Sequence, residues 1–171
     1  AEIVRIYGAI GGVPAYLDKW DAAKSFKENI CRLVLTPSGA LYGEADAVIS
    51  SELRELSAYS TILAAIARGE NKLNDIFHAT GFSRAKISVY LKNLATFNIV
   101  EKVVSFETGG WENAKKGVYQ IKDTFVNFWF KFVYPNMSNL YLLSPEEFYD
   151  TYIEKELDAY LERYFREVCT E

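Results

Sequence analysis

The sequence contains few of the residues from which catalytic and metal sites are built. Among 171 residues it has one histidine, His78, and two cysteines, Cys31 and Cys169. The cysteines lie far apart with no second cysteine or histidine beside either, so we predict no zinc site and no disulfide framework. A single histidine cannot complete a serine–histidine or cysteine–histidine pair elsewhere in the chain. We therefore expect His78 to pack or lie at the surface, and we predict no catalytic residue and no metal ligand.

Sequence motifs for phosphate binding and membrane insertion are also missing. The pattern G-x-x-x-x-G-K-[ST] does not occur, and Gly11–Gly12 is not followed by a lysine, so no P-loop is predicted. The most apolar run, FVNFWFKFVY, is too short to span a bilayer and contains Lys131. We see no signal peptide and expect a cytoplasmic protein with reduced thiols and no membrane partner. Because the chain starts with Ala1 rather than methionine, we expect a fragment of a longer protein.

The composition is that of a globular protein with an uneven distribution of charge. Half of the residues are hydrophobic, a quarter are charged and 15% are aromatic, which excludes a disordered chain. The net charge of −4 conceals a basic middle, because residues 57–122 contain nine Lys or Arg against five Asp or Glu. The remainder of the chain contains ten Lys or Arg against eighteen Asp or Glu. Nucleic-acid binding is therefore predicted for the middle of the chain only.

The middle of the chain has the order of elements of a winged helix-turn-helix. Three helical patterns, AYSTILAAIARG, KLNDIFHATG and SRAKISVYLKNLATF, are followed by two strand patterns, IVEKVVSF and VYQIK. Gly81 supplies the turn between the second and third helices, and Ser83 is expected to cap the third. The helical spacing predicts that four residues of the third helix face the core, namely Ile87, Tyr90, Leu91 and Leu94.

The segments on either side are predicted to be helical. Ser25 and Glu28 have the spacing of a capping box. Before them, the GGVP sequence is expected to separate two short helices. Its composition alone favours an ordinary Gly-Pro loop. After the hairpin, an aromatic helix capped by Asp123 is apolar on nearly every face, so we expect it to be buried. One long helix should run from Ser144 to the last residue, and its aromatic face predicts a homo-oligomer.

The third helix of the winged unit is the candidate DNA-binding element. In this motif the third helix lies in the major groove, and residues near its N-terminus approach the base edges. Arginine can bind guanine in a bidentate manner, and lysine suits phosphate. The DNA-binding candidates in this helix and in the predicted wing are Ser83, Arg84, Lys86, Ser88, Lys92, Trp111, Lys115 and Lys116. The alternative is a module that packs on another domain and binds no nucleic acid.

Four segments together resemble a known family. The segments YGAIGGVPAYL, LYGEADAVISSELRE, TGFSRAKISVYLKNL and VYQIKDTFVNFWFKFVYPN, in this order, resemble the C-terminal half of archaeal-type ATPases. These are P-loop proteins of the AAA+/STAND-like group. The most specific pieces are GGVPAYL and FWFKFVYPN, and the resemblance covers essentially the whole chain.

The resemblance implies properties that the residues alone do not. It implies an N-terminal nucleotide-binding domain, absent here, that holds ATP and Mg²⁺ in the parent protein, whereas this fragment holds no cofactor. It places Gly11, Gly12 and Pro14 in a helical lid near the adenine end of ATP. It also implies a C-terminal nuclease-like domain as a further partner, of which only the start is present. In RYFREVC, Arg166 stands where the family usually has glutamate, so nuclease chemistry is not expected of this chain.

We therefore predict a mainly α fold, in which a winged helix-turn-helix with one small β-hairpin is flanked by additional helices. The predicted domains are a helical lid-type segment at 1–56, the winged unit at 57–122 and an aromatic-rich, truncated helical extension at 123–171. The predicted function is a non-catalytic module that binds double-stranded DNA or relays nucleotide state between domains. A third hypothesis is a stand-alone regulator with an effector site walled by Phe128, Trp129 and Phe132, although these rings are more typical of core.

Overall fold

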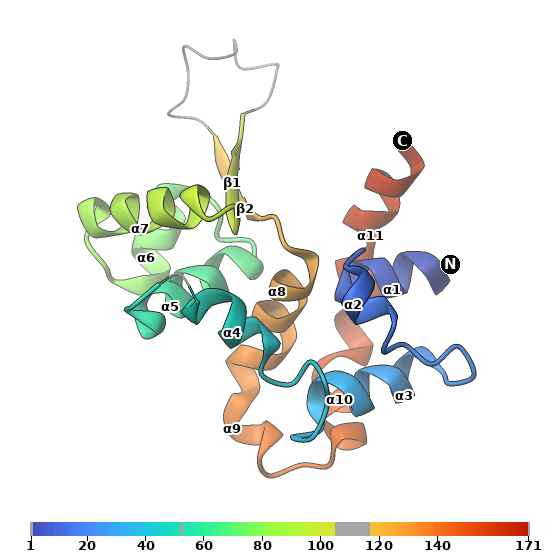
Figure 1. Ribbon diagram of the computed structural model, residues 1–171. Helices are drawn as coiled ribbons and strands as arrows, with labels where there is room; N and C mark the ends of the chain where they lie inside the picture. Colours follow the sequence, from blue (N-terminus) through green and yellow to red (C-terminus); the bar gives the residue numbers. More distant parts are fainter. Residues whose placement is uncertain (1, 52, 105–116, 171) are drawn as a thin grey trace. The chain divides into compact units, whose positions relative to one another are not determined.

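The computed structural model describes residues 2–51, 53–104 and 117–170 and is mainly helical (Figure 1). Its β structure in these residues is one two-stranded antiparallel sheet, so the predicted fold class is confirmed. The chain forms two compact units. Unit 1 comprises Ala1–Ile49 and Phe132–Glu171, and unit 2 comprises Ser50–Lys131. The three-segment division predicted from the sequence stays a prediction.

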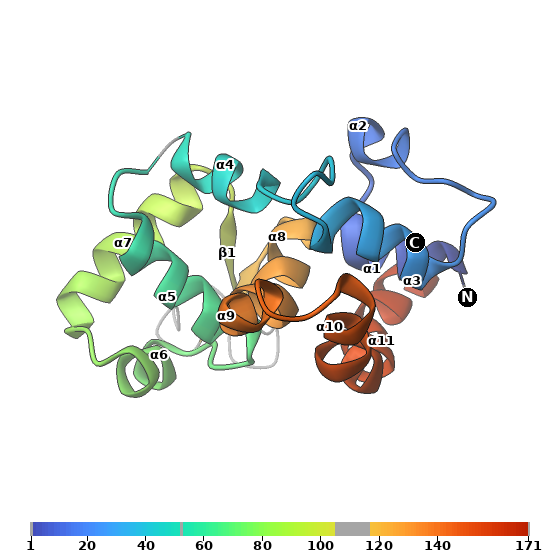
Figure 2. The same ribbon diagram turned by 90° about the horizontal axis from the view of Figure 1, so that it is seen from below.

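Unit 2 contains the helices and the hairpin of the predicted winged helix. Its elements are α5 (Leu56–Ala67), α6 (Leu73–Thr80), α7 (Arg84–Thr96), β1 (Val100–Val103), β2 (Val118–Ile121) and α8 (Thr124–Phe128). A π-helical segment, η4 (Trp129–Val133), continues α8. Helices α5, α6 and α7 form one group, and the hairpin follows α7 (Figures 1 and 2). This order of elements fits a winged helix.

The hairpin is joined to the helices through its second strand. Val100 pairs with Ile121 and Val103 with Val118 in the antiparallel ladder. On its other side, the backbone N–H of Tyr119 donates to the carbonyl of Asn71, at 2.7 Å, in the loop between α5 and α6. The hairpin is thus held by the ladder and by this bond to the helical group.

The helix ends of unit 2 are formed by the residues that the sequence indicated. Gly81 ends α6 with φ of +70°, a left-handed conformation that glycine adopts without strain. The Oγ of Ser83 accepts a hydrogen bond from the N–H of Lys86 and caps α7. The carboxylate of Asp123 does the same for α8 by accepting from the N–H of Val126. These three predictions are confirmed.

The aromatic segment after the hairpin is buried, as its composition predicts. Phe128, Trp129 and Phe132 are each at most 1% exposed. Large aromatic rings contribute strongly to core stability because each buries a large apolar area. Since the three rings present no open surface, the structure gives no support to an effector site walled by them.

The first part of unit 1 consists of short helices joined by ordered turns. These are α1 (Glu2–Ile10), α2 (Pro14–Leu17), α3 (Phe26–Ile30), the π-helical η1 (Cys31–Leu35) and α4 (Glu44–Ser50). The capping box of Ser25 and Glu28 at the start of α3 is confirmed. The fully buried Asn29 holds the preceding loop, because its amide nitrogen donates to the carbonyls of Asp21 and Ser25. Its amide oxygen accepts from the N–H of Asp21.

The C-terminal part of unit 1 differs from the prediction of one long helix. It contains η5 (Tyr134–Asn136), α9 (Met137–Leu140), α10 (Pro145–Tyr152) and α11 (Glu154–Thr170). The capping box of Ser144 and Glu147 is present, but the helix is interrupted at Ile153. Ile153 is fully buried, and the break lets both α10 and α11 turn apolar residues inward. The prediction of one uninterrupted helix is therefore wrong.

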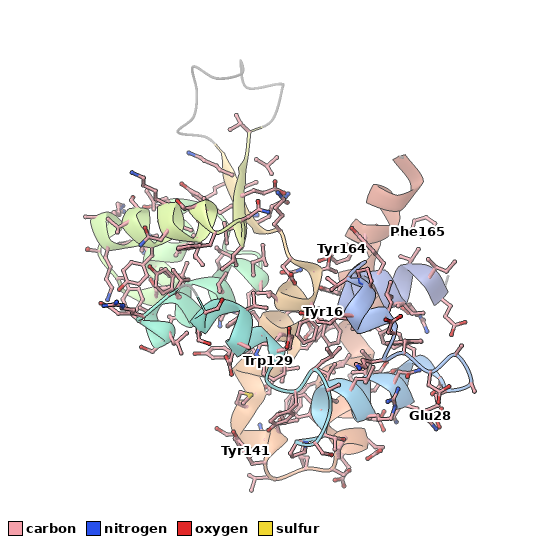
Figure 3. The ribbon with its side chains drawn as sticks, viewed as in Figure 1. Tyr16, Glu28, Trp129, Tyr141, Tyr164 and Phe165 are labelled. Atoms are coloured by element: carbon pink, nitrogen blue, oxygen red, sulfur yellow. The ribbon has the colours of Figure 1, made fainter. Side chains whose placement is uncertain are left out.

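Helix α11 packs against α1 through a glycine. A Cβ at Gly8 would lie 2.3 Å from the Leu161 side chain, and Tyr160 Oη donates to the Gly8 carbonyl at 3.0 Å. Figure 3 shows the neighbouring side chains of Tyr164 and Phe165 on α11. Tyr164 is 2% exposed and meets Tyr7 edge-on, whereas Phe165 is 55% exposed. The aromatic face of α11 is thus only partly covered by its own unit.

Candidate nucleic-acid interface

Helix α7 is oriented as its spacing predicts. Ile87, Tyr90, Leu91 and Leu94 are buried, with Ile87 and Leu94 fully so. The opposite side of the helix is exposed. The whole of α7, RAKISVYLKNLAT, contains three cationic side chains and no acidic one. A helix with this charge is compatible with a polyanion, because no carboxylate on it would repel phosphate.

Three of the predicted DNA-binding residues share one exposed face of α7. Arg84, Ser88 and Lys92 are exposed and recur at intervals of four residues, which places them on one side of a helix. Ser83 is also exposed, but its hydroxyl already caps the helix. We define the DNA face as Arg84, Ser88 and Lys92.

The Arg84 guanidinium is held in place by helix α6. Its central carbon lies 3.9 Å from the ring centroid of Phe77, and its Nη2 donates to Asn74 Oδ1. Stacking on an aromatic face and a hydrogen bond both limit the rotamers of a long side chain. Arg84 therefore remains exposed while its direction is restricted, and this lowers the entropy cost of a later contact.

Lys86 lies on a different flank of α7 from the DNA face. Its Nζ is 4.4 Å from the centroid of Phe82 and 5.3 Å from that of Tyr90, and the residue is half-buried. The sequence pattern indicated a cation near the start of the helix but not these two rings. Because Lys86 is half-buried and lies on another flank of α7, it is not part of the DNA face.

The hairpin carries two further cations that sequence reasoning did not single out. Lys102 in β1 is exposed with its Nζ 5.5 Å from the Tyr119 ring, and Lys122 donates to Asn98 Oδ1 at 2.7 Å. The available signal was one lysine in each of the two strand patterns, IVEKVVSF and VYQIK. The predicted wing residues Trp111, Lys115 and Lys116 lie outside the described residues.

Two packed tyrosines, each hydrogen-bonded to another residue, anchor α7 to the residues around the start of α5. Tyr90 Oη donates to the carboxylate of Glu55, and this bond raises the pKa of Tyr90 to about 12. The Tyr59 and Tyr90 rings are 4.4 Å apart, and Asn93 Nδ2 donates to Tyr59 Oη at 2.8 Å. None of these contacts was visible in the sequence, because the partners are more than thirty residues apart.

The GGVP segment forms the turn between α1 and α2 in unit 1. Gly11 has φ of +69° and is buried, so the turn itself requires glycine there. Gly12 and Pro14 are exposed, and a Cβ at Gly12 would meet only the Tyr7 ring, at 3.8 Å. Within the described residues, therefore, Gly12 has neither a positive φ nor a crowded position that demands glycine.

The cysteine, the histidine and the acidic residues described by the structure form no further site. The described residues contain no group of three or more His, Cys, Asp or Glu side chains able to hold a metal ion. His78 meets the ring of Phe77 edge-on, with the centroids 5.1 Å apart. Burial raises the pKa of the Cys31 thiol to about 11, which makes it a poor nucleophile at neutral pH. No helix in the described part of the chain has the length and apolar character needed to cross a membrane.

Comparison with known proteins indicates archaeal and bacterial relatives. Residues 129–171 match a family described as archaeal and bacterial proteins of unknown function. Over 137 residues the chain is 34% identical to an uncharacterized protein, MJECL04, of Methanocaldococcus jannaschii. The match covers 80% of this chain but only 30% of that protein. No solved structure matches the chain. The resemblance to P-loop ATPases stays a prediction.

Proposed function

We propose that this chain is a non-catalytic winged-helix module of a larger archaeal-type ATPase, and that its unit 2 contacts double-stranded DNA. The observation that carries the proposal is the open DNA face of α7, in which Arg84 and Lys92 are exposed above a buried apolar face. In winged helices this is the side of the third helix that enters the major groove.

The distribution of charge between the units supports the same proposal. Unit 2 contains eleven Lys or Arg against eight Asp or Glu, whereas unit 1 contains eight against fifteen. Phosphate neutralisation supplies most of the affinity of non-specific DNA binding. A duplex would therefore be attracted to unit 2 and repelled by unit 1.

In this proposal, unit 1 would transmit the nucleotide state of a neighbouring ATPase domain to the winged helix. The exposed Gly12 and Pro14 leave the α1–α2 turn open to a neighbouring domain, and Gly12 has no requirement within its own fold. By resemblance, that neighbour would be the nucleotide-binding domain with ATP and Mg²⁺, which the residues of this chain do not hold. A shift of the lid on nucleotide binding would then move the winged helix attached to it.

The alternative is a domain-packing module without nucleic acid. The observation in its favour is Val89, which is 56% exposed on α7 and would suit a protein surface better than a phosphate backbone. The two functions differ in how they respond to the loss of cations from α7.

A titration of fluorescent duplex DNA separates these functions. We expect Arg84→Ala/Lys92→Ala to weaken binding about 10- to 100-fold at low salt, because two charge-assisted contacts are removed. The matched control is Lys24→Ala/Lys155→Ala, which removes two exposed cations from unit 1 and should leave affinity unchanged. Equal losses in both double variants would indicate general charge attraction and would contradict the assigned face.

Self-association through α11 is a second proposal, supported by the exposed Phe165 beside a groove between α11 and α1. This groove measures about 270 Å³ and is lined by the apolar Val4, Leu161 and Phe165 and by the charged Arg5, Asp158 and Glu162. In sedimentation velocity, we expect Phe165→Ser to shift the chain toward monomer and Leu142→Ser, also at an exposed site, to have no effect. A wild-type chain that stays monomeric at high concentration would refute this.

A further inference from the structure

A pocket of about 480 Å³ lies beside the DNA face, entirely within unit 2. One wall is the segment that leads into α5, and the other is the C-terminal half of α7. Its lining residues are Leu53, Arg54, Glu55, Tyr59, Val89, Tyr90, Asn93 and Phe97. The volume is within the range of sites that take small organic molecules.

The most buried part of the lining is aromatic and fixed in position. Tyr59 and Tyr90 are 5% and 9% exposed, and their rings are tilted by 39° with centroids 4.4 Å apart. The Tyr90 hydroxyl is tied to Glu55, and Asn93 is tied to the Tyr59 hydroxyl. The two rings therefore form a fixed apolar part of the lining, with Lys86 Nζ 5.3 Å from the Tyr90 centroid.

The polar groups that these bonds leave over include two acceptor oxygens. Glu55 accepts from Tyr90 through Oε2, which leaves Oε1 without a donor among the described residues. Asn93 uses its Nδ2 as a donor, so its Oδ1 likewise has no donor within the described part of the chain. A ligand that enters the pocket therefore meets a carboxylate and an amide oxygen as well as the guanidinium of Arg54, and a group with N–H donors and positive charge complements the two oxygens.

The outer part of the lining is apolar and solvent-exposed. Val89, in the middle of α7, is 56% exposed, and Phe97, the C-cap of α7, is 40% exposed. Exposed large apolar side chains beside a concave site provide a contact for the body of a ligand. The complementary molecule is thus amphipathic, with a cationic end and an apolar remainder.

We propose that this pocket binds a small organic cation, that is, a primary ammonium or guanidinium group carried on an aromatic or aliphatic body. The cation pairs with the Glu55 carboxylate, and the body contacts Val89 and Phe97. This inference does not depend on DNA binding, because no residue of the DNA face lines the pocket.

The positive charge of Arg54 makes the proposal predict opposite effects on ligand affinity for two neighbouring substitutions. Arg54 lines the same pocket and is exposed, so its guanidinium repels a bound cation and would attract an anion. Removing Arg54 should therefore strengthen the binding of the proposed ligand, whereas removing the charge of Glu55 should weaken it. A pocket that is merely apolar would respond to neither change.

Three probes of the same shape and different charge test the proposal on the full chain. These are 3-phenylpropylamine, 3-phenylpropan-1-ol and 3-phenylpropanoate, titrated at millimolar concentrations while ¹H–¹⁵N spectra are recorded. We expect the amine to bind roughly tenfold more tightly than the alcohol and the carboxylate to bind least. The largest shifts should occur at the amides of the lining residues.

Two variants and a control complete the experiment. Glu55→Gln keeps an acceptor for Tyr90 and should abolish the preference for the amine, and Arg54→Ala should increase it. Asp75→Asn, at an exposed acid of α6 outside the pocket, removes the same charge and should change nothing. If Glu55→Gln perturbs the fold, the Arg54→Ala result decides alone. Equal affinities for the amine and the alcohol, no shifts with the amine, or unchanged affinity in Arg54→Ala would overturn the proposal.

Discussion

Replacing Leu94 by alanine is expected to lower the free energy of unfolding of unit 2 by roughly 2–5 kcal/mol, the usual cost of a truncated core leucine. Leu94 is fully buried, and its carbonyl also accepts from the N–H of Ile99 at the turn that leads into β1. Truncation leaves a cavity at the junction of α7 and the hairpin. The measurement is chemical denaturation of the full chain followed by circular dichroism.

The control for Leu94→Ala lies on the same helix. Val89 is 56% exposed, so Val89→Ala should change stability by no more than about 0.5 kcal/mol. Similar losses of stability in Leu94→Ala and Val89→Ala would mean that α7 does not turn the face that contains Leu94 toward the core. The assignment of the DNA face would then be wrong as well.

Replacing Gly39 by alanine is expected to cost unit 1 roughly 1–3 kcal/mol or more, because the new methyl group would collide with backbone. An ideal Cβ at this position would lie 2.4 Å from the carbonyl oxygen of Leu33 and 2.6 Å from that of Arg32. These carbonyls belong to η1, and the turn around Gly39 is closed by bonds from Gly39 N–H to Thr36 and from Leu41 N–H to Leu33. Neither backbone segment can shift without breaking such bonds.

A second glycine nearby provides the comparison. A Cβ at Gly43 would meet no atom within 4 Å, so Gly43→Ala should be neutral or stabilising by about 0.4–1 kcal/mol through the unfolded chain. Thermal unfolding of the two variants side by side measures the difference. If Gly39→Ala were as stable as Gly43→Ala, the close approach of Gly39 to η1 would be refuted.

Local signals in the sequence were sufficient to predict the elements of unit 2. The buried positions of α7 follow from their spacing, and Gly81 and Ser83 mark the two ends of the turn before it. Asp123 marks the start of α8 in the same way. Each of these features depends on residues within one or two helical turns, where side-chain chemistry constrains the backbone directly.

Features that depend on distant residues were not predictable. At the break at Ile153 the chain passes from α10, which packs on η1, to α11, which packs on α1, and no local residue type indicates this change of partner. The placement of Lys86 over Phe82 and Tyr90, and the bond from Tyr90 to Glu55, similarly require the packed unit. As a result the spacing in the sequence placed Arg84 and Lys92 on one side of α7, but it indicated neither the ring contacts of Lys86 nor the pocket.

The salt dependence of duplex binding by the wild-type chain tests the central claim most directly. With Arg84, Lys92 and at least one further cation of unit 2 on phosphates, the slope of log K against log salt concentration should be about −3 or steeper between about 50 and 200 mM. In Arg84→Ala/Lys92→Ala the slope should be less negative by about 2. Absence of binding at the lowest salt concentration, or a slope near zero, would contradict the account.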